Sequence, residues 1–507
     1  MIRTSISIPV LLGLSALPFS AFAATEKQCP PGLEADAPTV PLSVEQADIN
    51  SGALDFDEVS EHGEALFVAR FNRCDGSGRP LTTGGGDARA FPTVSEEGET
   101  LSLGQIEKLR TSAPDSDACA GCHAQPEAGG AGDFVANVFV LAQTLDPVTL
   151  SVSPSRSNSR NTLGMHGSGP IEMLTREMTV ELQAAAAGLP DGIHTISAKG
   201  VDFTIEMSGG VVVATDGGVD NDLVVKPFHQ AGKVTSLREF STNAMNHHHG
   251  MQAEERFDLN PAKAFDPDFD GDGMERELTL GDQTAISIWQ AQLDVPQQVM
   301  PKKKKDRDMV KHGEQVFDDI GCTSCHVPEM TLSSRDFVEP NPFNPPGTCN
   351  NEAPDFEDLC PPVSFDMTKK AGLEKGPNGT AIVRAYTDLK RHSLCDNDIN
   401  FFCNEELAQG RADAIDGTPG TEFFLTRKLW DVGNTAPYGH RGDISTITEA
   451  ILYHGGAGRA SRDAFEASST ADQKAVVAFL KTLQIVPQGD KDKGSRNNRG
   501  GKGRDDH

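Results

Sequence analysis

The chain has 507 residues, of which 37% are hydrophobic, and its formal charge at pH 7 is −29. This length predicts more than one domain, and the apolar content is sufficient for hydrophobic cores. The acidic balance argues against nucleic acid and anionic membrane surfaces as partners and favours cationic or neutral ones, although a need for solubility would also explain it.

A secretory signal peptide is predicted over residues 1–23. Arg3 precedes an apolar run from Ile8 to Leu14, and Ala21-Phe22-Ala23 forms a small-x-small cleavage site. No later stretch approaches the roughly 18 consecutive apolar residues of a membrane span. We therefore expect a periplasmic or secreted chain with no membrane span, in which disulfides are admissible.

The first chemical motif is Cys119-Ala120-Gly121-Cys122-His123, which follows a helix expected over 61–72. Two thiols at this spacing can add across the two vinyl groups of a haem, and the adjacent imidazole then becomes the proximal iron ligand. The pattern predicts a covalently bound c-type haem held by Cys119, Cys122 and His123.

Alternating hydrophobicity follows this motif. The segments 135–141, 201–207 and 211–213 are expected to be strands, and 172–187 is expected to be a helix. The N-terminal domain, residues 24–300, is thus predicted to be helical with a small β excursion.

A further helix is expected from Thr235 to Met245, followed by His247-His248-His249. Neighbours on a helix diverge by about 100°, so the three imidazoles cannot all face one metal. One of them, with His248 preferred, is expected to reach the distal face of the first haem. The alternative is a polar helix end with surface imidazoles.

An acidic loop after this helix fits the calcium pattern D-x-D-x-D-G-x5-E. Carboxylates at alternating positions wrap a hard cation, the glycine allows a sharp turn, and the final glutamate binds in a bidentate manner. The alternative is a solvated acidic turn. The expected Ca²⁺ ligands are Asp266, Asp268, Asp270, Asp272 and Glu277.

The lysine-rich segment 301–308 is expected to be a charged linker. A second CxxCH motif follows it, with Cys322, Cys325 and His326 predicted to hold a second c-type haem in a domain spanning 309–487. Residues 488–507 are expected to be disordered. Six further cysteines suggest disulfides whose connectivity the sequence does not fix, with the guessed pairs Cys29–Cys74, Cys349–Cys360 and Cys395–Cys403.

Two motifs near the C-terminus carry a family resemblance. They are Thr435-Ala436-Pro437-Tyr438-x-His440-x-Gly442 and Glu449-Ala450-Ile451-Leu452-x-His454. With the two CxxCH motifs, they resemble the di-haem oxidoreductase family, which is related to bacterial di-haem cytochrome c peroxidases. The resemblance implies a mainly α fold, with two cytochrome c-like haem domains and long loops.

The resemblance also implies the axial ligands of the C-terminal haem. In the peroxidases the position of His454 is usually Met, so a histidine there implies a bis-His, low-spin, low-potential haem held by His326 and His454. His440 is the competing ligand.

The distal pocket of the N-terminal haem departs from the peroxidases. They carry Phe-Trp-Asp-Gly-Arg and then Leu-Glu-Glu, which supply the proton shuttling for O–O cleavage. The similar stretch here, 227–239, lacks the Trp and Asp and keeps Glu239 as its acid. The expected catalytic residues are therefore His229, Glu239 and His248, with His166 as a further candidate.

These features predict an exported di-haem c-type cytochrome oxidoreductase. Its C-terminal haem would take electrons from a small redox protein or small-molecule donor, and its N-terminal haem would reduce peroxide or another small oxidant. Trp289 or Trp430 is a candidate relay, against the more common role of a buried Trp in the core. The alternatives are a non-catalytic di-haem electron carrier and a di-haem oxygenase of the rubber-cleaving type. A zinc or thioredoxin interpretation is disfavoured because each CxxC pair carries its histidine.

Overall fold

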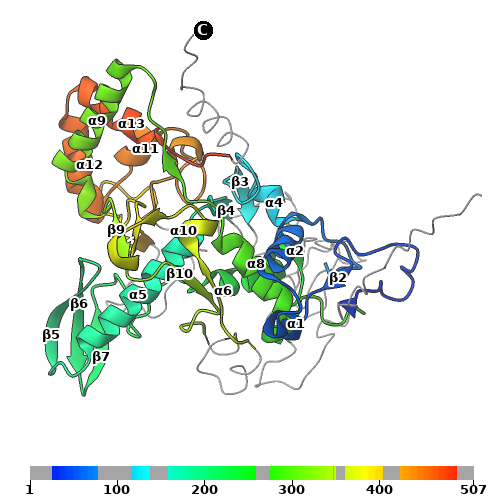
Figure 1. The fold of residues 1–507 in the computed structure, drawn as a ribbon. Coiled ribbons are helices and arrows are strands. Elements are labelled where there is room, and N and C mark those ends of the chain that lie inside the picture. Colours follow the sequence, from blue (N-terminus) through cyan, green and yellow to red (C-terminus); the bar gives the residue numbers. More distant parts are fainter. Residues whose placement is uncertain are drawn as a thin grey trace, which may run out of the picture.

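The computed structural model describes residues 25–77, 116–137, 158–257, 273–345, 348–349, 360–402 and 423–487 (Figure 1). The predicted signal peptide, the tail 488–507 and the acidic residues 266–272 lie outside these ranges. Among the helices in the described ranges, none has the length and apolar character that crossing a membrane requires.

The N-terminal half mixes helices with short strands. Its helices are α1 (Gln46–Ser51), α2 (Phe56–Val68), α4 (Cys119–Cys122), α5 (Ser168–Ala186), α6 (Leu237–Ala244), the π-helical turn η1 (Met245–His249), α7 (Glu254–Phe257) and α8 (Leu280–Ala291). Its strands are β1 (Thr25–Glu26), β2 (Leu42–Ser43), β3 (Phe134–Asn137), β4 (Asn158–Asn161), β5 (Gly192–Ala198), β6 (Val201–Ser208), β7 (Val211–Thr215) and β8 (Gln297–Gln298).

The C-terminal half has longer helices at its two ends and short strand pairs between them. The helices are α9 (Lys304–Asp319), α10 (Met367–Lys370), α11 (Ile447–Leu452), α12 (Arg459–Ala467) and α13 (Thr470–Leu480). Short 3-10 turns lie at η2 (Cys322–Ser324), η3 (Pro377–Gly379), η4 (Val432–Asn434) and η5 (Gly456–Gly458). The strands are β9 (Met330–Leu332), β10 (Asp336–Glu339), β11 (Val363–Asp366), β12 (Glu374–Lys375), β13 (Ala381–Val383), β14 (Arg391–Ser393), β15 (Phe423–Leu425) and β16 (Leu483–Gln484).

The fold is mixed, which corrects the prediction of a mainly α chain. The sheets β12-β13-β9, β10-β11 and β14-β15 connect segments of the C-terminal half that carry too few residues for an alternating pattern to stand out. The predicted β excursion is present as the antiparallel sheet β5-β6-β7. Along β6, buried and exposed residues alternate, as expected for a strand with one covered face.

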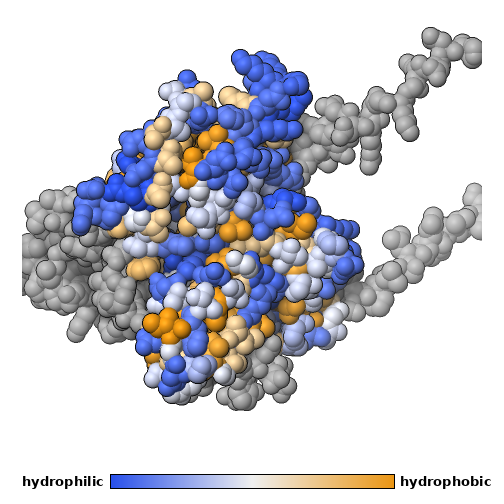
Figure 2. Space-filling model, turned by 90° about the vertical axis from the view of Figure 1, so that its left-hand side faces the viewer, coloured by the Kyte–Doolittle hydropathy of each residue, from blue (hydrophilic) through white to orange (hydrophobic). Residues whose placement is uncertain are grey.

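The sheet β5-β6-β7 and helix α5 extend away from the rest of the molecule (Figure 1). The buried face of β6 and the apolar stripe of α5 belong to the largest core cluster, to which Leu174, Met178 and Phe203 contribute. Figure 2 shows a mostly hydrophilic face interrupted by apolar patches. The exposed apolar side chains of the sheet are Ile193, Val211 and Val213.

Two helix pairs repeat the same packing. α2 packs on α8, and α9 packs on α13 (Figure 1). At each crossing a glycine allows the backbones to approach closely, because a Cβ on Gly63 would lie 2.1 Å from the Ala285 carbonyl and one on Gly313 would lie 1.9 Å from the Ala475 carbonyl. The sequence around both glycines is His-Gly-Glu-x-x-Phe, at residues 62–67 and 312–317.

The two histidines of this repeat make equivalent contacts with aspartates. His62 Nε2 lies 2.7 Å from Asp282 of α8, and His312 Nε2 lies 2.6 Å from Asp472 of α13. Each aspartate is the third residue of its helix, and its backbone N–H donates to the hydroxyl of the N-cap residue. The N-cap is Thr279 for Asp282 and Ser469 for Asp472. The chain therefore contains two modules built on the same helix crossing, each associated with one CxxCH motif.

Most of the predicted linker at 301–308 is helical. Helix α9 begins at Lys304, and the Lys304 ammonium pairs with the Asp308 carboxylate one turn later at 2.7 Å. Lysine and aspartate at this spacing stabilise a helix, so a charged run does not by itself mark a linker.

Two of the guessed disulfides are confirmed, namely Cys29–Cys74 and Cys349–Cys360. Cys395 is also disulfide-bonded, and its expected partner, Cys403, lies outside the described residues. Cys119, Cys122, Cys322 and Cys325 form no disulfide. The sulfur atoms of the two CxxCH motifs are therefore available to bond to a group other than cysteine.

Candidate functional site

A cavity of about 330 Å³ surrounds the second CxxCH motif. The C-terminal half provides Cys322, Cys325, His326 and His454 to its wall, and residues 161–164 of the N-terminal half close it from another side. Hydrogen bonds between the halves fix this arrangement, because the His440 carbonyl accepts the Asn161 N–H at 2.8 Å. The cavity is therefore shared between the two modules.

His326 is held by the backbone. It follows α9 after the turn at Gly321, where φ is +81°, and its Nδ1 donates to the Tyr386 carbonyl at 3.1 Å. Burial, followed by the charge of His454, lowers the pKa of His326 to about 4. The ring is therefore neutral at physiological pH, with Nε2 available as a metal ligand.

His454 follows α11, as the helix-end prediction requires. The helix starts with a capping box in which Thr446 and Glu449 satisfy each other's backbone N–H. His454 Nδ1 donates to the Ala450 carbonyl at 2.8 Å, and burial lowers its pKa. This ring also remains neutral with Nε2 available.

The rings of His326 and His454 lie opposite each other. Their centres are 6.5 Å apart, with an interplanar angle of 62°. Two imidazoles bound to one metal at about 2 Å on either side have ring centres about 6 Å apart. The pair, the cavity and the thiols of Cys322 and Cys325 provide the ligand types that a covalently bound haem would require. His440 lines the same cavity and packs against Phe402 and Phe424, with ring centres 5.8 and 4.9 Å away.

Next to Cys325 lies a carboxylate–imidazole pair that sequence inspection missed. Asp388 Oδ2 lies 2.6 Å from His392 Nε2, and these groups and the Cys325 sulfur all lie within 4.8 Å of one another. Burial opposes protonation of His392, but hydrogen bonds to Asp388 and Cys325 outweigh it and raise the pKa of His392 to about 10. No local motif marks Asp388 or His392, because they reach the site through non-local packing.

The first CxxCH motif occupies helix α4. His123 Nδ1 donates to the Leu163 carbonyl at 2.9 Å, and burial lowers the pKa of His123 to about 4. Phe67 packs beside His123 with ring centres 6.3 Å apart, and in the second module Phe317 and His326 are 6.2 Å apart. The two motifs are therefore presented to their surroundings in the same way.

The first thiol of each motif is not activated for thiolate chemistry. Burial raises the pKa of Cys119 and of Cys322 to about 12. Reactive and metal-binding cysteines require a lowered pKa. This environment disfavours the thioredoxin and zinc interpretations.

The predicted triple histidine lies in the π-helical turn η1, and π-helical turns are frequent at functional sites. His249 Nε2 lies 3.3 Å from the Cys119 sulfur, and its Nδ1 donates to the Ser116 carbonyl at 2.7 Å. His248 is partly buried, and its charge contributes to the lowered pKa of His123. The turn therefore brings two of its histidines to the first motif.

The other predicted distal residues lie as follows. The Glu239 carboxylate accepts the Thr235 N–H at 2.7 Å and so caps α6, and burial raises its pKa. His229 lines the cavity around His326 and His454. His166 is buried, with Nδ1 donating to the Asp294 carbonyl at 3.1 Å and Nε2 lying 3.8 Å from Glu127.

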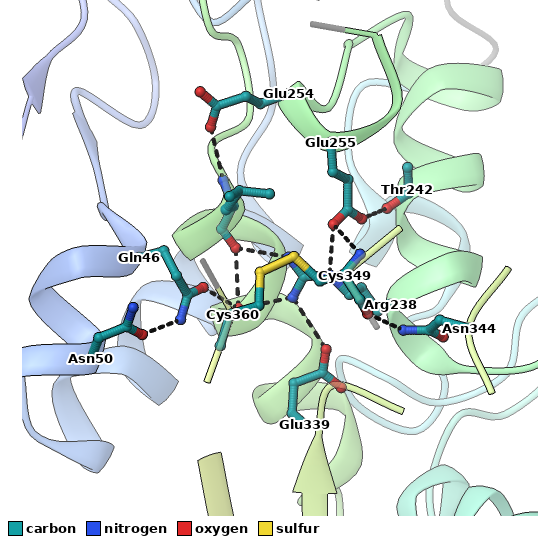
Figure 3. Close-up of a disulfide and its surroundings, with 12 residues drawn as sticks. Gln46, Asn50, Arg238, Thr242, Glu254, Glu255, Glu339, Asn344, Cys349 and Cys360 are labelled. Atoms are coloured by element: carbon teal, nitrogen blue, oxygen red, sulfur yellow. Dashed lines mark hydrogen bonds and ion pairs between the residues drawn. A yellow bond between two sulfur atoms is a disulfide. The ribbon is translucent and has the colours of Figure 1, made fainter. Parts of the chain in front are cut away.

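Buried charges anchor helix α6, which precedes η1. Arg238 is fully buried and donates to Glu255 at 2.8 Å and to Glu339 at 3.2 Å (Figure 3). The Cys349–Cys360 disulfide lies beside this network, and the Cys349 N–H donates to Glu255 at 3.4 Å. The network fixes the start of the segment that carries His248 and His249.

Only Glu277 of the predicted calcium ligands lies in the described residues. It is buried, and its Oε2 accepts the Gln252 N–H at 2.6 Å. Calcium binding by this loop stays a prediction.

The two tryptophans differ in their surroundings. Trp289 packs on Phe67 with ring centres 4.4 Å apart, as Phe479 packs on Phe317 at 5.6 Å in the second module. It therefore fills a core position. Trp430 packs against Gly167, and its buried Nε1 has no hydrogen-bond partner within the described part of the chain.

Residues 360–483 match the family model described as "Di-haem oxidoreductase, putative peroxidase". The matched segment contains both C-terminal motifs, so the resemblance seen in the sequence is confirmed there. The cytochrome-c peroxidase IdrP2 of Pseudomonas sp. (strain SCT) is 43% identical over 65 residues, which cover 13% of this chain and 18% of that protein. The chain thus matches less than a fifth of the length of this curated relative.

Two solved structures show weaker likeness. Hydrazine synthase of Kuenenia stuttgartiensis, pressurised with 20 bar xenon, aligns over 95% of this chain and 100% of its own, with TM-score 0.34 and 11% identity. A MauG-like protein associated with microbial copper homeostasis aligns over 62% of this chain and 89% of its own, with TM-score 0.27 and 15% identity.

Proposed function

We propose that the chain is an exported di-haem c-type oxidoreductase. Cys322, Cys325, His326 and His454 would hold a six-coordinate electron-transfer haem, and Cys119, Cys122 and His123 would hold a second haem that meets peroxide or another small oxidant. Electrons would come from a small redox protein or small-molecule donor. The family match over residues 360–483 supports a redox enzyme.

The opposed pair of His326 and His454 carries this proposal. Each ring uses Nδ1 to donate to a carbonyl, which orients Nε2 as the remaining ligand atom. A backbone partner of this kind fixes the tautomer and ring orientation of a ligating histidine. With His326 and His454 on its two sides, a bound haem would have no open position for substrate, so this site suits electron entry.

At the first site, the residues of η1 would supply proton chemistry. Peroxide reduction requires protons delivered to the departing oxygen, and a haem iron supplies the electrons and the peroxide-binding position when it is bound. His248 is the proposed proton donor because it is partly buried and close enough to His123 to influence its pKa. His249 is committed to Ser116 and the Cys119 sulfur, so it would position the motif.

Trp430 is the proposed relay between the modules. Its indole packs on Gly167, in the loop that also provides the Leu163 carbonyl to His123. Its neighbours in sequence, among them Lys428, Leu429 and Asp431, line the cavity of the second site. Trp430 thus contacts the loop that holds His123 at the first site, and its neighbours in sequence line the cavity of the second site.

A two-part experiment tests the function. The mass of the secreted chain should exceed its polypeptide mass by two haems, and a pyridine haemochrome spectrum should be c-type. The reduced holoprotein should then be reoxidised by peroxide, and Cys119→Ser/Cys122→Ser should lose that reaction while keeping one reducible haem. Absence of covalent haem, or reoxidation that survives in this variant, would contradict the proposal.

A non-catalytic electron carrier is the second candidate. The approach of His248 to the first motif favours it, because an imidazole there could close the sixth position of the iron. In that case both irons would be low-spin and peroxide would leave them unchanged.

A further inference from the structure

Three cationic side chains other than histidines line the cavity around His326 and His454: Arg427, Lys428 and Arg462. Arg427 pairs with Asp431 at 2.9 Å. Arg462 pairs with Asp463 at 2.5 Å and with Glu466 at 3.0 Å. These two guanidinium groups are compensated by carboxylates of their own helix or turn.

Lys428 lacks such compensation. Its ammonium donates to the Gly164 carbonyl at 3.2 Å, and within the described residues no carboxylate lies at ion-pair distance from it. Burial, with the neighbouring charge of Arg427, outweighs the attraction of Asp431 and lowers the pKa of Lys428 to about 7. A half-buried ammonium with no counter-charge at ion-pair distance among the described residues is costly, so this part of the wall is suited to an anion that the described part of the chain does not supply.

The position of Lys428 is fixed from both modules. Its partner Gly164 is adjacent to Leu163, whose carbonyl orients His123. Gly164 also packs against the Asp431 carboxylate, because a Cβ on Gly164 would lie 2.8 Å from Asp431 Oδ2. The charge of Lys428 reaches His123, since it contributes to the lowered pKa of that ring. Lys428 thus lies between the proximal side of the first site and the cavity of the second.

A c-type haem carries two propionates in addition to the vinyl groups that its cysteines consume. Thioether bonds at Cys322 and Cys325 would fix the vinyl edge, so the carboxylates must meet another part of the wall. An ammonium there is the natural partner for a carboxylate in a low-dielectric site.

We propose that Lys428 is the propionate-binding residue of the second haem site, pairing its ammonium with a haem carboxylate at the junction of the two modules. This inference rests on the proposed function, since it requires a haem between His326 and His454. The paired ammonium then stays charged across neutral pH and raises the reduction potential of the haem.

The groups that titrate or carry charge around Lys428 are Arg427, Asp431 and His123. The other titratable groups of the cavity wall are Cys322, Cys325, His229, His326, His392, Tyr438, His440, His454 and Arg462. A pH-dependent signal must be assigned against these, and substitution of Lys428 itself provides the assignment.

The test is a redox titration of the holoprotein, followed at the second haem between about pH 5 and 8. The unaltered protein should show a potential that is constant across this range. Lys428→Met should shift the equilibrium about tenfold toward the oxidised iron, which lowers the reduction potential by about 59 mV for one electron. Its potential should also become pH-dependent, falling as pH rises, because the freed propionate gains a higher pKa.

Lys428→Arg keeps the charge and should retain the original potential. Lys226→Met is the matched control, because Lys226 is a partly buried lysine that pairs with Asp220 at 2.8 Å instead of lining the cavity. It should leave the potential unchanged. If Lys428→Met loses the haem, Lys428→Gln replaces it in the same titration.

Two outcomes would overturn the inference. One is a potential and pH profile that Lys428→Met leaves as they were. The other is a potential that falls as pH rises through 7 in the unaltered protein but stays constant in Lys428→Met. That result would show that the lysine is unpaired and itself titrates. A chain without covalent haem in the haemochrome assay would overturn the proposed function as well, so the two failures are distinguishable.

Discussion

His326 and His454 lie with their ring centres 6.5 Å apart, and each donates from Nδ1 to a backbone carbonyl. The two histidines come from segments more than a hundred residues apart, one after α9 and the other after α11. Their opposition across one cavity defines the second site, and the predictions below follow from it and from the supports of the first site.

Replacing His454 by Met should convert the second haem from bis-His to His/Met ligation. A thioether ligand favours the reduced iron, so the potential should rise by on the order of 0.1 V. Redox titration with visible spectroscopy measures this change. His440→Met is the matched control from the same cavity, and a rise in the His440 variant alone would identify His440 as the ligand.

Replacing His248 by Gln should slow reoxidation by peroxide by a factor of about 10²–10⁴, the usual contribution of a positioned acid or base. Stopped-flow mixing of the reduced holoprotein with peroxide gives the rate. The electron-transfer haem should be unaffected, so its rate of reduction by an external donor is the internal control. A reoxidation rate equal to that of the unaltered protein would remove His248 from the proposed role.

Arg238→Met should destabilise the fold by about 3–5 kcal/mol, because it leaves buried carboxylates without their partner. Urea unfolding at neutral pH measures the loss. Arg384 makes a similar number of ion pairs with Glu329 and Glu374 at the surface. Arg384→Met should therefore cost only about 0–1 kcal/mol. Equal losses in the two variants would show that burial does not govern these networks.

Glu339 should make stability depend on pH. Burial raises the pKa of Glu339 to about 7, with the charge of Glu172 adding to the rise and Arg238 opposing it. The unfolded value is about 4.3, so between pH 4 and 7 the folded chain binds more protons than the unfolded one, and the free energy of unfolding falls as pH rises.

Glu339→Gln removes this titration. The variant should gain stability relative to the unaltered protein as pH rises through that window, and urea unfolding at several pH values gives the difference. A difference that stays constant from acid to neutral pH would mean that Glu339 is ionised throughout.

The sequence located the candidate ligand residues more readily than the residues around them. The CxxCH spacing marks Cys119, Cys122, Cys325 and their neighbours because haem attachment needs those atoms in that order, and the place of His454 follows from a capped helix that ends beside it. Local patterns such as the alternation in β6 were equally readable.

Features that depend on contacts between distant segments could not be predicted from the sequence. The sequence places His229 near the first haem, but the Leu425 N–H of β15 donates to the Gln230 carbonyl at 2.8 Å, and His229 lines the cavity of the second site. Asp388, His392 and Lys428 carry no motif and act through contacts that only the folded chain creates. The strand pairs of the C-terminal half were missed because two or three residues give no periodic signal.

The division of labour between the two sites is tested most directly by electron paramagnetic resonance of the oxidised holoprotein. We predict one low-spin signal from the iron between His326 and His454 and one high-spin signal from the iron on His123, with peroxide changing only the latter. Two low-spin signals, both unchanged by peroxide, would contradict the account and identify the chain as an electron carrier.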